Sequence, residues 1–168
     1  FVAHFEQVGY EEQTADRRFF DISENFVLEG ENGAEMMAVP SNGQFRITVM
    51  VDYESPVLGT QHATMYHLGQ FIPDISRSRT FVFLKEVKPL MESGLIKGGD
   101  MANAIVLAER KYSQAELDEL AQLTGKKNLE IELGKIGVLN NTKLQFENEP
   151  ARHKLLDIIG DLALTGRF

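Results

Sequence analysis

The sequence contains no cysteine, no tryptophan and only four histidines among its 168 residues. Without thiols it can form neither disulfides nor a thiolate zinc site, so any metal ligand must be a histidine or a carboxylate. Basic residues are also in deficit, with 17 Lys and Arg against 25 Asp and Glu and a formal net charge of -8. Binding of nucleic acid through a basic surface is therefore not expected.

Long apolar runs are absent too. No stretch approaches the roughly 18 apolar residues of a membrane-spanning helix, and no charged segment followed by an apolar run opens the chain. We therefore expect no transmembrane segment and a cytoplasmic location. Because 43% of the residues are hydrophobic, a buried core can form. The chain starts without Met and stops directly after a predicted helix, so we expect both ends to be cuts in a longer protein.

The spacing of apolar residues predicts both helices and strands. Helical spacing indicates short helices over 1–8 and 86–91, and the capping-box pair Ser113 and Glu116 predicts the start of another helix. Alternation with a period of two predicts an antiparallel meander over 18–52. Short apolar segments predict further strands at 80–84, 104–107, 129–133, 136–139 and 144–146. The sequence therefore predicts one α+β domain, with an antiparallel or mixed sheet packed against helices.

The last predicted helix begins near Pro150, a residue suited to a first helical turn. Along it, His153, Asp157 and Asp161 follow one another at four-residue steps and share one face, with Lys154 beside them. A histidine and an aspartate one turn apart can bind the same zinc ion, since nitrogen and oxygen donors both suit this metal. The same spacing also fits a solvated ion pair, so this face predicts either a metal site or the ion-paired helix face of a non-catalytic binding or interaction module.

Four blocks of the sequence carry a further signal. They are Arg152-His-Lys-Leu-Leu-Asp157-Ile-Ile-Gly-Asp161-Leu, Ile75-Ser-Arg-Ser-Arg-Thr80-Phe, the glycine turn and strand at 94–106, and Leu144-Gln-Phe-Glu-Asn-Glu149. Together they resemble, in the family's order, the zinc-dependent UDP-3-O-acyl-N-acetylglucosamine deacetylases of lipid A synthesis. The residues at 11–13, 57–61 and 96–100 are most similar to those of the Bacteroidetes-type form of the family. In that form the deacetylase is commonly fused to a 3-hydroxyacyl carrier-protein dehydratase, which we expect as a partner domain.

The resemblance implies one half of a two-domain α/β sandwich enzyme. Residues 1–15 correspond to the tail of the first deacetylase domain, and residues 16–168 to the second domain, truncated at its C-terminus. A strand-helix-strand insert is expected at about 104–139. This insert is longer than the commonest form of the family, so its substrate contacts cannot be copied position by position.

The resemblance also implies roles for particular side chains. His153 and Asp157 are expected to be two of three protein ligands of a catalytic zinc that leaves one position for water. Thr80 is expected to stabilise an oxyanion, Lys154 to contact the substrate, and Asp161 to orient a catalytic histidine.

Substrate contacts are implied at five further positions. Tyr53 lies where the family has an aromatic residue near the uridine end of the substrate, and Phe81 closes the strand block that contains Thr80. Met101, Ala104 and Val106 are expected along an apolar passage for the acyl chain. Local departures occur nearby, where Glu86 replaces a typical Asp and Val82 a typical Gly.

The family's third zinc ligand and general base come from a Glu-His pair, and no such dipeptide occurs here. His4, His62 and His67 match no family position and are expected to be ordinary polar residues. The complete enzyme is expected to remove the N-acetyl group from UDP-3-O-(3-hydroxyacyl)-N-acetylglucosamine, whereas these 168 residues alone are expected to bind zinc weakly and to be inactive. Another possibility is a degenerate deacetylase-like domain kept for acyl binding in a fusion.

Overall fold

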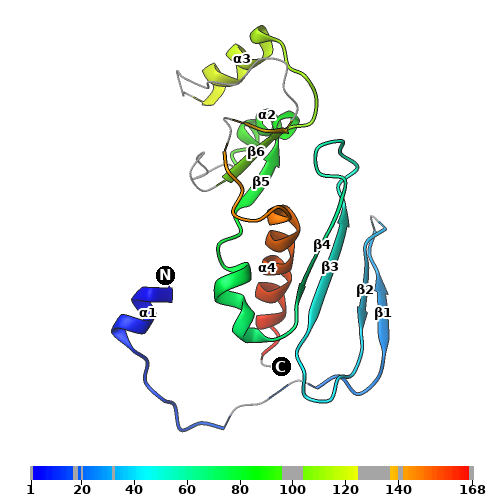
Figure 1. The fold of residues 1–168 in the computed structure, drawn as a ribbon, viewed down its shortest axis with the longest axis vertical. Coiled ribbons are helices and arrows are strands. Elements are labelled where there is room, and N and C mark those ends of the chain that lie inside the picture. The colour runs from blue at the N-terminus through cyan, green and yellow to red at the C-terminus, as the bar shows by residue number, and fades with distance from the viewer. Residues whose placement is uncertain are drawn as a thin grey trace. The chain divides into compact units, whose positions relative to one another are not determined.

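The structure is a computed structural model that describes residues 2–16, 19, 21–31, 33–95, 104–124, 137–139 and 142–166 (Figure 1). The chain divides into two compact units. The first comprises Phe1–Asn42 with Leu162–Phe168, and the second comprises Gly43–Asp161. Among the described residues, no helix combines the length and the apolar character that crossing a membrane requires.

The first unit contains a short helix and a hairpin. Helix α1 spans Val2–Val8, as its apolar spacing predicts. Strands β1 (Phe26–Glu29) and β2 (Glu35–Ala38) pair antiparallel, with Phe26 opposite Ala38. Gly33 lies in the connecting turn with a φ of 72°, a conformation that glycine adopts without steric cost. The first hairpin of the predicted meander is therefore confirmed.

The second unit begins with another hairpin. Strand β3 (Ile47–Asp52) alternates between partly buried and exposed residues and pairs antiparallel with β4 (Thr60–Met65). Each hairpin is a two-stranded sheet within its own unit, so the joining of the strands over 18–52 into one meander remains a prediction. Alternation reports which face of a strand is buried, and it does not identify the neighbouring strand.

A mixed three-stranded sheet follows in the same unit. Strand β5 (Thr80–Phe83) pairs parallel with β6 (Ala104–Ala108), and β6 pairs antiparallel with β7 (Gly137–Val138). Helix α2 (Leu84–Glu92) follows β5, and α3 (Gln114–Thr124) lies between β6 and β7 in the chain. The α+β class, the mixed sheet and the strand-helix-strand order of the insert are confirmed. The strand predicted at 129–133 lies outside the described residues.

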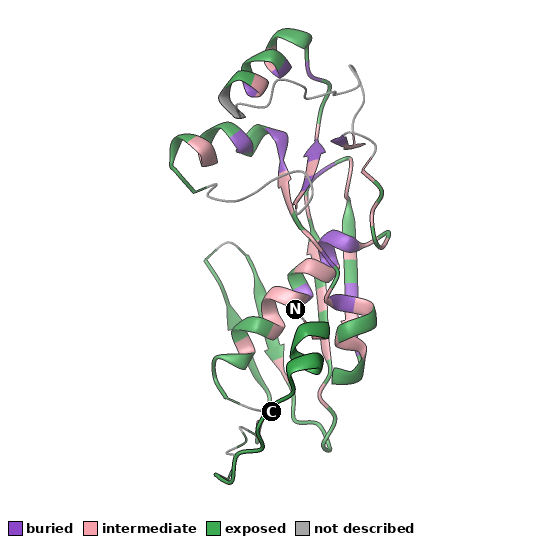
Figure 2. Cartoon of the chain, turned by 90° about the vertical axis from the view of Figure 1, so that its left-hand side faces the viewer, coloured by how far each residue is buried: buried purple, intermediate pink, exposed green. Residues whose placement is uncertain are grey.

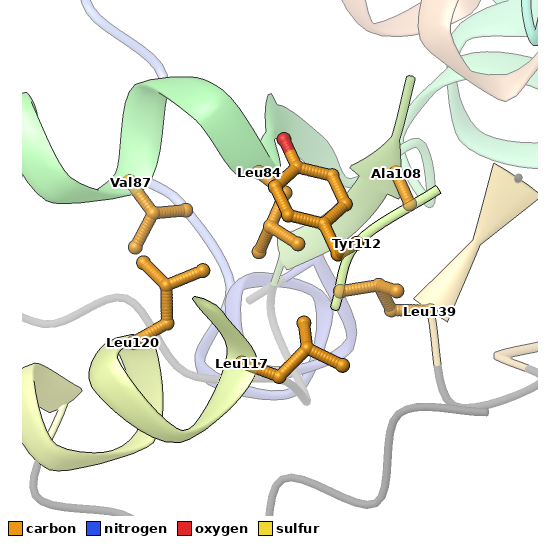
Figure 3. Packing of buried hydrophobic residues seen from close by; sticks show 7 residues of the cluster. All are labelled: Leu84, Val87, Ala108, Tyr112, Leu117, Leu120 and Leu139. Carbon is orange, nitrogen blue, oxygen red and sulfur yellow. The ribbon is translucent and has the colours of Figure 1, made fainter. Parts of the chain in front are cut away.

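Helices α2 and α3 share an apolar core with the mixed sheet. Leucines of α2 and α3 meet around Tyr112, and Ala108 and Leu139 close the cluster from the sheet side (Figure 3). The buried members of this cluster are Leu84, Val87, Ala108, Tyr112, Leu117, Leu120 and Leu139. These residues come from α2, β6, the segment before α3, α3 and the residue after β7, so their burial holds the two helices against the mixed sheet.

Helix α4 (Glu149–Ala163) is the longest helix described. Its buried residues lie in the first two turns, whereas the later residues are partly buried or exposed (Figure 2). Ala151 and Leu155 pack with Ala63 and Met65 of β4. The same cluster includes Ile75, which ends a single π-helical turn, η2 (Phe71–Ile75), that follows the 3₁₀ turn η1 (Leu68–Gln70).

The strand predicted at 144–146 is wrong. This segment bends and turns into α4 instead of pairing with a neighbouring strand. Leu144 packs against the cluster of Phe83, Ile105 and Leu107, while the Gln145 N–H donates to the Glu149 carboxylate. The backbone amide that a sheet would use is therefore already satisfied by a side chain of the next helix.

Candidate metal centre

The pair His153 and Asp157 lies on α4 one turn past its buried start. The imidazole Nε2 and the carboxylate Oδ1 are 3.6 Å apart, and the side chains are 17% and 41% exposed. The other ring nitrogen, Nδ1, is 3.2 Å from the carbonyl oxygen of Ser78. Because a carbonyl can only accept, Nδ1 carries the hydrogen in this contact, and in the neutral ring Nε2 keeps its lone pair.

The spacing of the two donor atoms fits a shared cation. A contact of 3.6 Å is too long for a hydrogen bond between Nε2 and Oδ1. Two ligand atoms at adjacent corners of a tetrahedral zinc site are about 3.4 Å apart, given zinc-ligand bonds of about 2.0 to 2.2 Å. A lone pair and a carboxylate oxygen that face each other repel unless a proton on Nε2 or a metal cation lies between them. The residues present therefore fit two ligands of a zinc ion.

Lys154, Phe81 and Tyr53 continue the site from Asp157. The Lys154 Nζ is 3.3 Å from Asp157 Oδ2 and lies 5.8 Å from the centre of the Phe81 ring. The rings of Phe81 and Tyr53 meet edge to face with centroids 5.4 Å apart. Burial, together with the negative charge of Asp157, raises the pKa of Tyr53 to about 12, so its phenol stays protonated at neutral pH. With His153, the structure thus brings together five of the residues singled out in the sequence.

Thr80 opens β5 two residues after Ser78, whose carbonyl faces His153. Thr80 is exposed and pairs with Ala104 in the parallel register. Val106 packs against the insert core, and Met101 lies outside the described residues. Asp161, one turn beyond Asp157, is exposed. The roles expected for these residues remain predictions.

A third ligand is not found within the described ranges. No group of three or more His, Asp or Glu side chains that could hold a metal ion occurs there. His4, His62 and His67 are all exposed. The His62 backbone carbonyl accepts a hydrogen bond from the Asn148 side-chain amide at 2.8 Å. Within the described part of the chain, then, the candidate centre offers two donors, both on α4.

A buried ion pair between Arg79 and Glu149 adjoins this centre, and the sequence reading missed it. Glu149 Oε1 accepts from the Arg79 N–H and Nε, both at 2.9 Å, and Oε2 accepts from Arg79 Nη2 at 3.0 Å and from the Gln145 N–H at 2.6 Å. Arg79 Nη2 also donates to the Lys143 carbonyl. Burial raises the pKa of Glu149, but these hydrogen bonds outweigh it and the net pKa is lowered.

Each residue of this pair lies in a segment that the sequence singles out, but the two segments are far apart in the chain. Glu149 is an acidic residue in the first turn of α4, which favours negative charge, and Arg79 lies inside the block that precedes β5. The two residues are 70 positions apart, so no helical or strand spacing connects them. Two further bonds anchor the same end of α4: Arg152 Nη1 donates to the Asp74 carbonyl at 2.6 Å, and Asn148 donates to the His62 carbonyl.

Comparison with known proteins assigns the family. The family model described as "LpxC: UDP-3-O-acyl N-acetylglycosamine deacetylase" matches residues 1–120 and 115–168, which is nearly the whole chain. The chain belongs to the UDP-3-O-acyl-N-acetylglucosamine deacetylase family. The resemblance found in the sequence blocks is thereby confirmed.

Relatives of this deacetylase-family chain include longer proteins. It is 41% identical to a "Bifunctional enzyme LpxC/FabZ" of Bacteroides thetaiotaomicron over 99% of the chain and 36% of that relative. It is 43% identical to a protein of the same name from Chlorobaculum tepidum, over 94% of the chain and 34% of the relative. A "UDP-3-O-acyl-N-acetylglucosamine deacetylase" of Shewanella violacea is 34% identical over 99% of the chain and 46% of its own length. The chain thus spans about a third of the length of the bifunctional relatives and somewhat under half of the other.

Proposed function

We propose that this chain forms part of a zinc-dependent deacetylase that removes the N-acetyl group from UDP-3-O-(3-hydroxyacyl)-N-acetylglucosamine in lipid A synthesis. Its membership of the family supports the reaction. The observation that supports the site is the pair of donor atoms on α4, Nε2 of His153 and Oδ1 of Asp157, held 3.6 Å apart with Nδ1 turned to a carbonyl. That arrangement suits two ligands of one zinc ion.

The side chains around the pair have separate roles in this proposal. When bound, zinc supplies a Lewis acid that polarises the acetamide carbonyl and makes water more acidic. His153 and Asp157 hold the ion. The Thr80 hydroxyl donates to the oxygen on which negative charge develops, and the Asp161 carboxylate orients a histidine that protonates the leaving amine.

The side chains beside Asp157, namely Lys154, Phe81 and Tyr53, bind the substrate in this proposal. The Lys154 ammonium contacts the sugar or the diphosphate, since a cation attracts these polar or anionic groups. Tyr53 and Phe81 offer an edge-to-face aromatic pair to the uridine end of the substrate. Met101, Ala104 and Val106 line the passage of the acyl chain.

The organisation of the protein is also proposed. Residues 1–15 belong to the end of the first deacetylase domain and residues 16–168 to the second, with a 3-hydroxyacyl carrier-protein dehydratase fused in the same polypeptide. The bifunctional names of two relatives support this fusion. Because only two ligands are found among the described residues, the 168 residues alone are proposed to bind zinc weakly and to release no acetate. A cytoplasmic location likewise remains a prediction.

The test compares His153→Ala with wild type in the complete gene product. Acetate release from the UDP-linked substrate and zinc content after dialysis are measured together. We expect the variant to lose zinc and to lose about 100-fold or more in kcat/KM, since a Lewis acid contributes several kcal/mol. His62→Ala is the matched control, because His62 is exposed and uses only its backbone in the structure. It should keep both zinc and activity.

The same experiment separates the alternatives. The ion pair of Lys154 with Asp157, at 3.3 Å, is what favours a non-catalytic helix face. If that were its only role, His153→Ala would leave zinc content and acetate release as in wild type. A degenerate domain kept for acyl binding would bind the substrate without releasing acetate even as wild type. Either result would overturn the proposal.

A further inference from the structure

One peptide group connects the buried ion pair to the metal centre. The peptide bond between Ser78 and Arg79 has its N–H on Arg79 and its carbonyl on Ser78. The N–H donates to Glu149 Oε1 at 2.9 Å, and the carbonyl oxygen is 3.2 Å from His153 Nδ1. Glu149 and His153 are four residues apart on α4 and therefore lie one turn apart on the same helix face. Both ends of a single peptide group are bound by neighbouring turns of one helix.

The carboxylate of Glu149 fixes the direction of this peptide group. Its side chain is fully buried, and it accepts four hydrogen bonds, three of them from the main chain and side chain of Arg79. A rotation of the peptide would leave the Arg79 N–H and one carboxylate lone pair buried without partners. Buried polar groups without partners are strongly disfavoured. The N–H therefore points at Glu149 and the carbonyl points the opposite way, at His153.

The direction of the carbonyl in turn decides which nitrogen of His153 carries the hydrogen. Facing an oxygen that only accepts, Nδ1 must donate, so Nε2 keeps the lone pair that a metal requires. If the peptide were turned over, an N–H would face Nδ1. The ring would then hold its hydrogen on Nε2, the atom that lies 3.6 Å from Asp157 Oδ1. A metal could not bind at that nitrogen.

We propose that Glu149, paired with Arg79, is a positioning residue of the metal centre: by orienting the Ser78–Arg79 peptide it holds His153 in the tautomer and direction that a zinc ion needs. Glu149 itself touches neither metal nor substrate in this proposal. The catalytic consequence rests on the proposed deacetylase function, whereas the effects on tautomer and metal affinity do not.

The principal test is Glu149→Gln in the complete gene product. Glutamine has the size of glutamate, but an NH₂ group replaces one of the two carboxylate oxygens. An NH₂ group cannot accept from an N–H donor, so the hydrogen bonds that this oxygen accepts in wild type are lost. Zinc affinity is measured by competition with a chelator. The tautomer of His153 is read in the zinc-free protein by ¹⁵N NMR of labelled histidine, with His153→Ala identifying the signal. Both readouts are independent of turnover.

We expect zinc affinity to fall by about 10- to 100-fold, the range typical of residues that orient a metal ligand. The hydrogen of His153 should shift in part from Nδ1 to Nε2. In turnover, kcat should fall by a similar factor while KM changes by less than about twofold, because the contacts of Lys154, Phe81 and Tyr53 remain. Glu119→Gln is the matched control. It removes a glutamate from an exposed ion pair with Lys88 and should change none of these quantities.

A second variant covers the case in which Glu149→Gln does not fold. Arg79→Lys keeps the charge and the backbone N–H but removes the paired contacts of the guanidinium, so it should shift the same quantities in the same direction by less. Wild-type tautomer and zinc affinity in whichever variant is folded would overturn the inference. If wild type releases no acetate, the proposed function fails, and the tautomer and chelator measurements still decide this inference.

Discussion

Two helices that begin in the second unit have, in their first turn, a glutamate that pairs with an arginine, and the two glutamates differ in burial. At α3, Glu116 accepts from the Ser113 N–H and hydroxyl and from Arg110, and its side chain is 41% exposed. At α4, Glu149 accepts hydrogen bonds from two main-chain N–H groups and from Nε and Nη2 of Arg79, and its side chain is fully buried. Similar chemistry thus serves a helix start in water and a helix start in the core.

The difference lies in what each carboxylate connects. All partners of Glu116 lie within six residues of it, so the contacts fix only the local start of α3. Glu149 binds Arg79, 70 residues earlier, and so connects the helix that carries His153 and Asp157 to the segment before β5. A surface ion pair is screened by water and contributes little, whereas a buried carboxylate cannot lose its partners without a large cost.

Removal of the buried Glu149 carboxylate should have the largest effect on stability. Glu149→Ala leaves the Arg79 guanidinium, only 18% exposed, without its charge partner and leaves the Gln145 N–H without an acceptor. We expect the free energy of unfolding to fall by about 3 to 5 kcal/mol. Urea unfolding followed by circular dichroism measures it. A loss below about 1 kcal/mol would mean that the two helix starts are energetically alike.

The next largest difference between the two glutamates is expected in how stability depends on pH. The hydrogen bond from Arg110, followed by those from Ser113, lowers the pKa of Glu116 from 4.5 to about 2, and the pKa of Glu149 is lowered as well. A carboxylate whose folded pKa is lowered contributes its full stability above its unfolded pKa and loses it as the pH falls toward the folded value. We therefore expect wild-type stability to decline from about pH 4.5 to pH 2.

The pH dependence of stability in each glutamine variant shows which glutamate causes the loss of stability at low pH. Glu149→Gln should flatten the curve below pH 4.5 more than Glu116→Gln, because the exposed pair with Arg110 is screened by solvent. Urea midpoints measured at intervals between pH 7 and pH 2 give both curves. Equal flattening by the two variants would contradict the importance assigned to burial.

The cap of α3 should have a smaller effect. Ser113→Ala removes the hydroxyl that lies 3.4 Å from the Glu116 N–H and donates to its carboxylate. Loss of an N-cap serine costs about 1 kcal/mol. Urea unfolding should show this loss, and Ser113→Thr, which keeps a hydroxyl that can both donate and accept, serves as the control and should retain most of the stability.

Loss of the exposed ion pair between α2 and α3 should have the smallest effect on stability. Lys88 and Glu119 form an ion pair with side chains 45% and 59% exposed. We expect Glu119→Gln to leave the urea midpoint unchanged within error, at low salt and at high salt, because the pair is solvated in both conditions. A salt-dependent loss of stability would show that this pair takes part in a wider charge network.

The sequence predicted the features that depend on local spacing. Helix α3 follows from its capping box, and the shared face of His153 and Asp157 follows from a four-residue step. Strand β4 was missed because its residues are mostly polar and only Ala63 and Met65 are buried on it. The segment 144–146 looked like a strand because apolar residues alternate there, although its amide is used by Glu149.

The site was predictable only in part. The resemblance brought Lys154, Phe81 and Tyr53 into consideration, and the structure shows that they form a row beside Asp157. The Ser78 carbonyl that faces His153 could not be found from residue types, since every residue has a carbonyl. Contacts between distant main-chain and side-chain groups depend on the packed fold, which the spacing of apolar residues does not encode.

The anchoring of α4 bears on the cost of capturing an ion. Its first turns are bound to the loop before β5 through Arg79, to η2 through Arg152 and to β4 through Asn148. The main chain of these turns has therefore lost its conformational freedom on folding, before any ion binds. An ion bound between His153 and Asp157 would not need to order the main chain that carries them, so less conformational entropy would be lost when it binds.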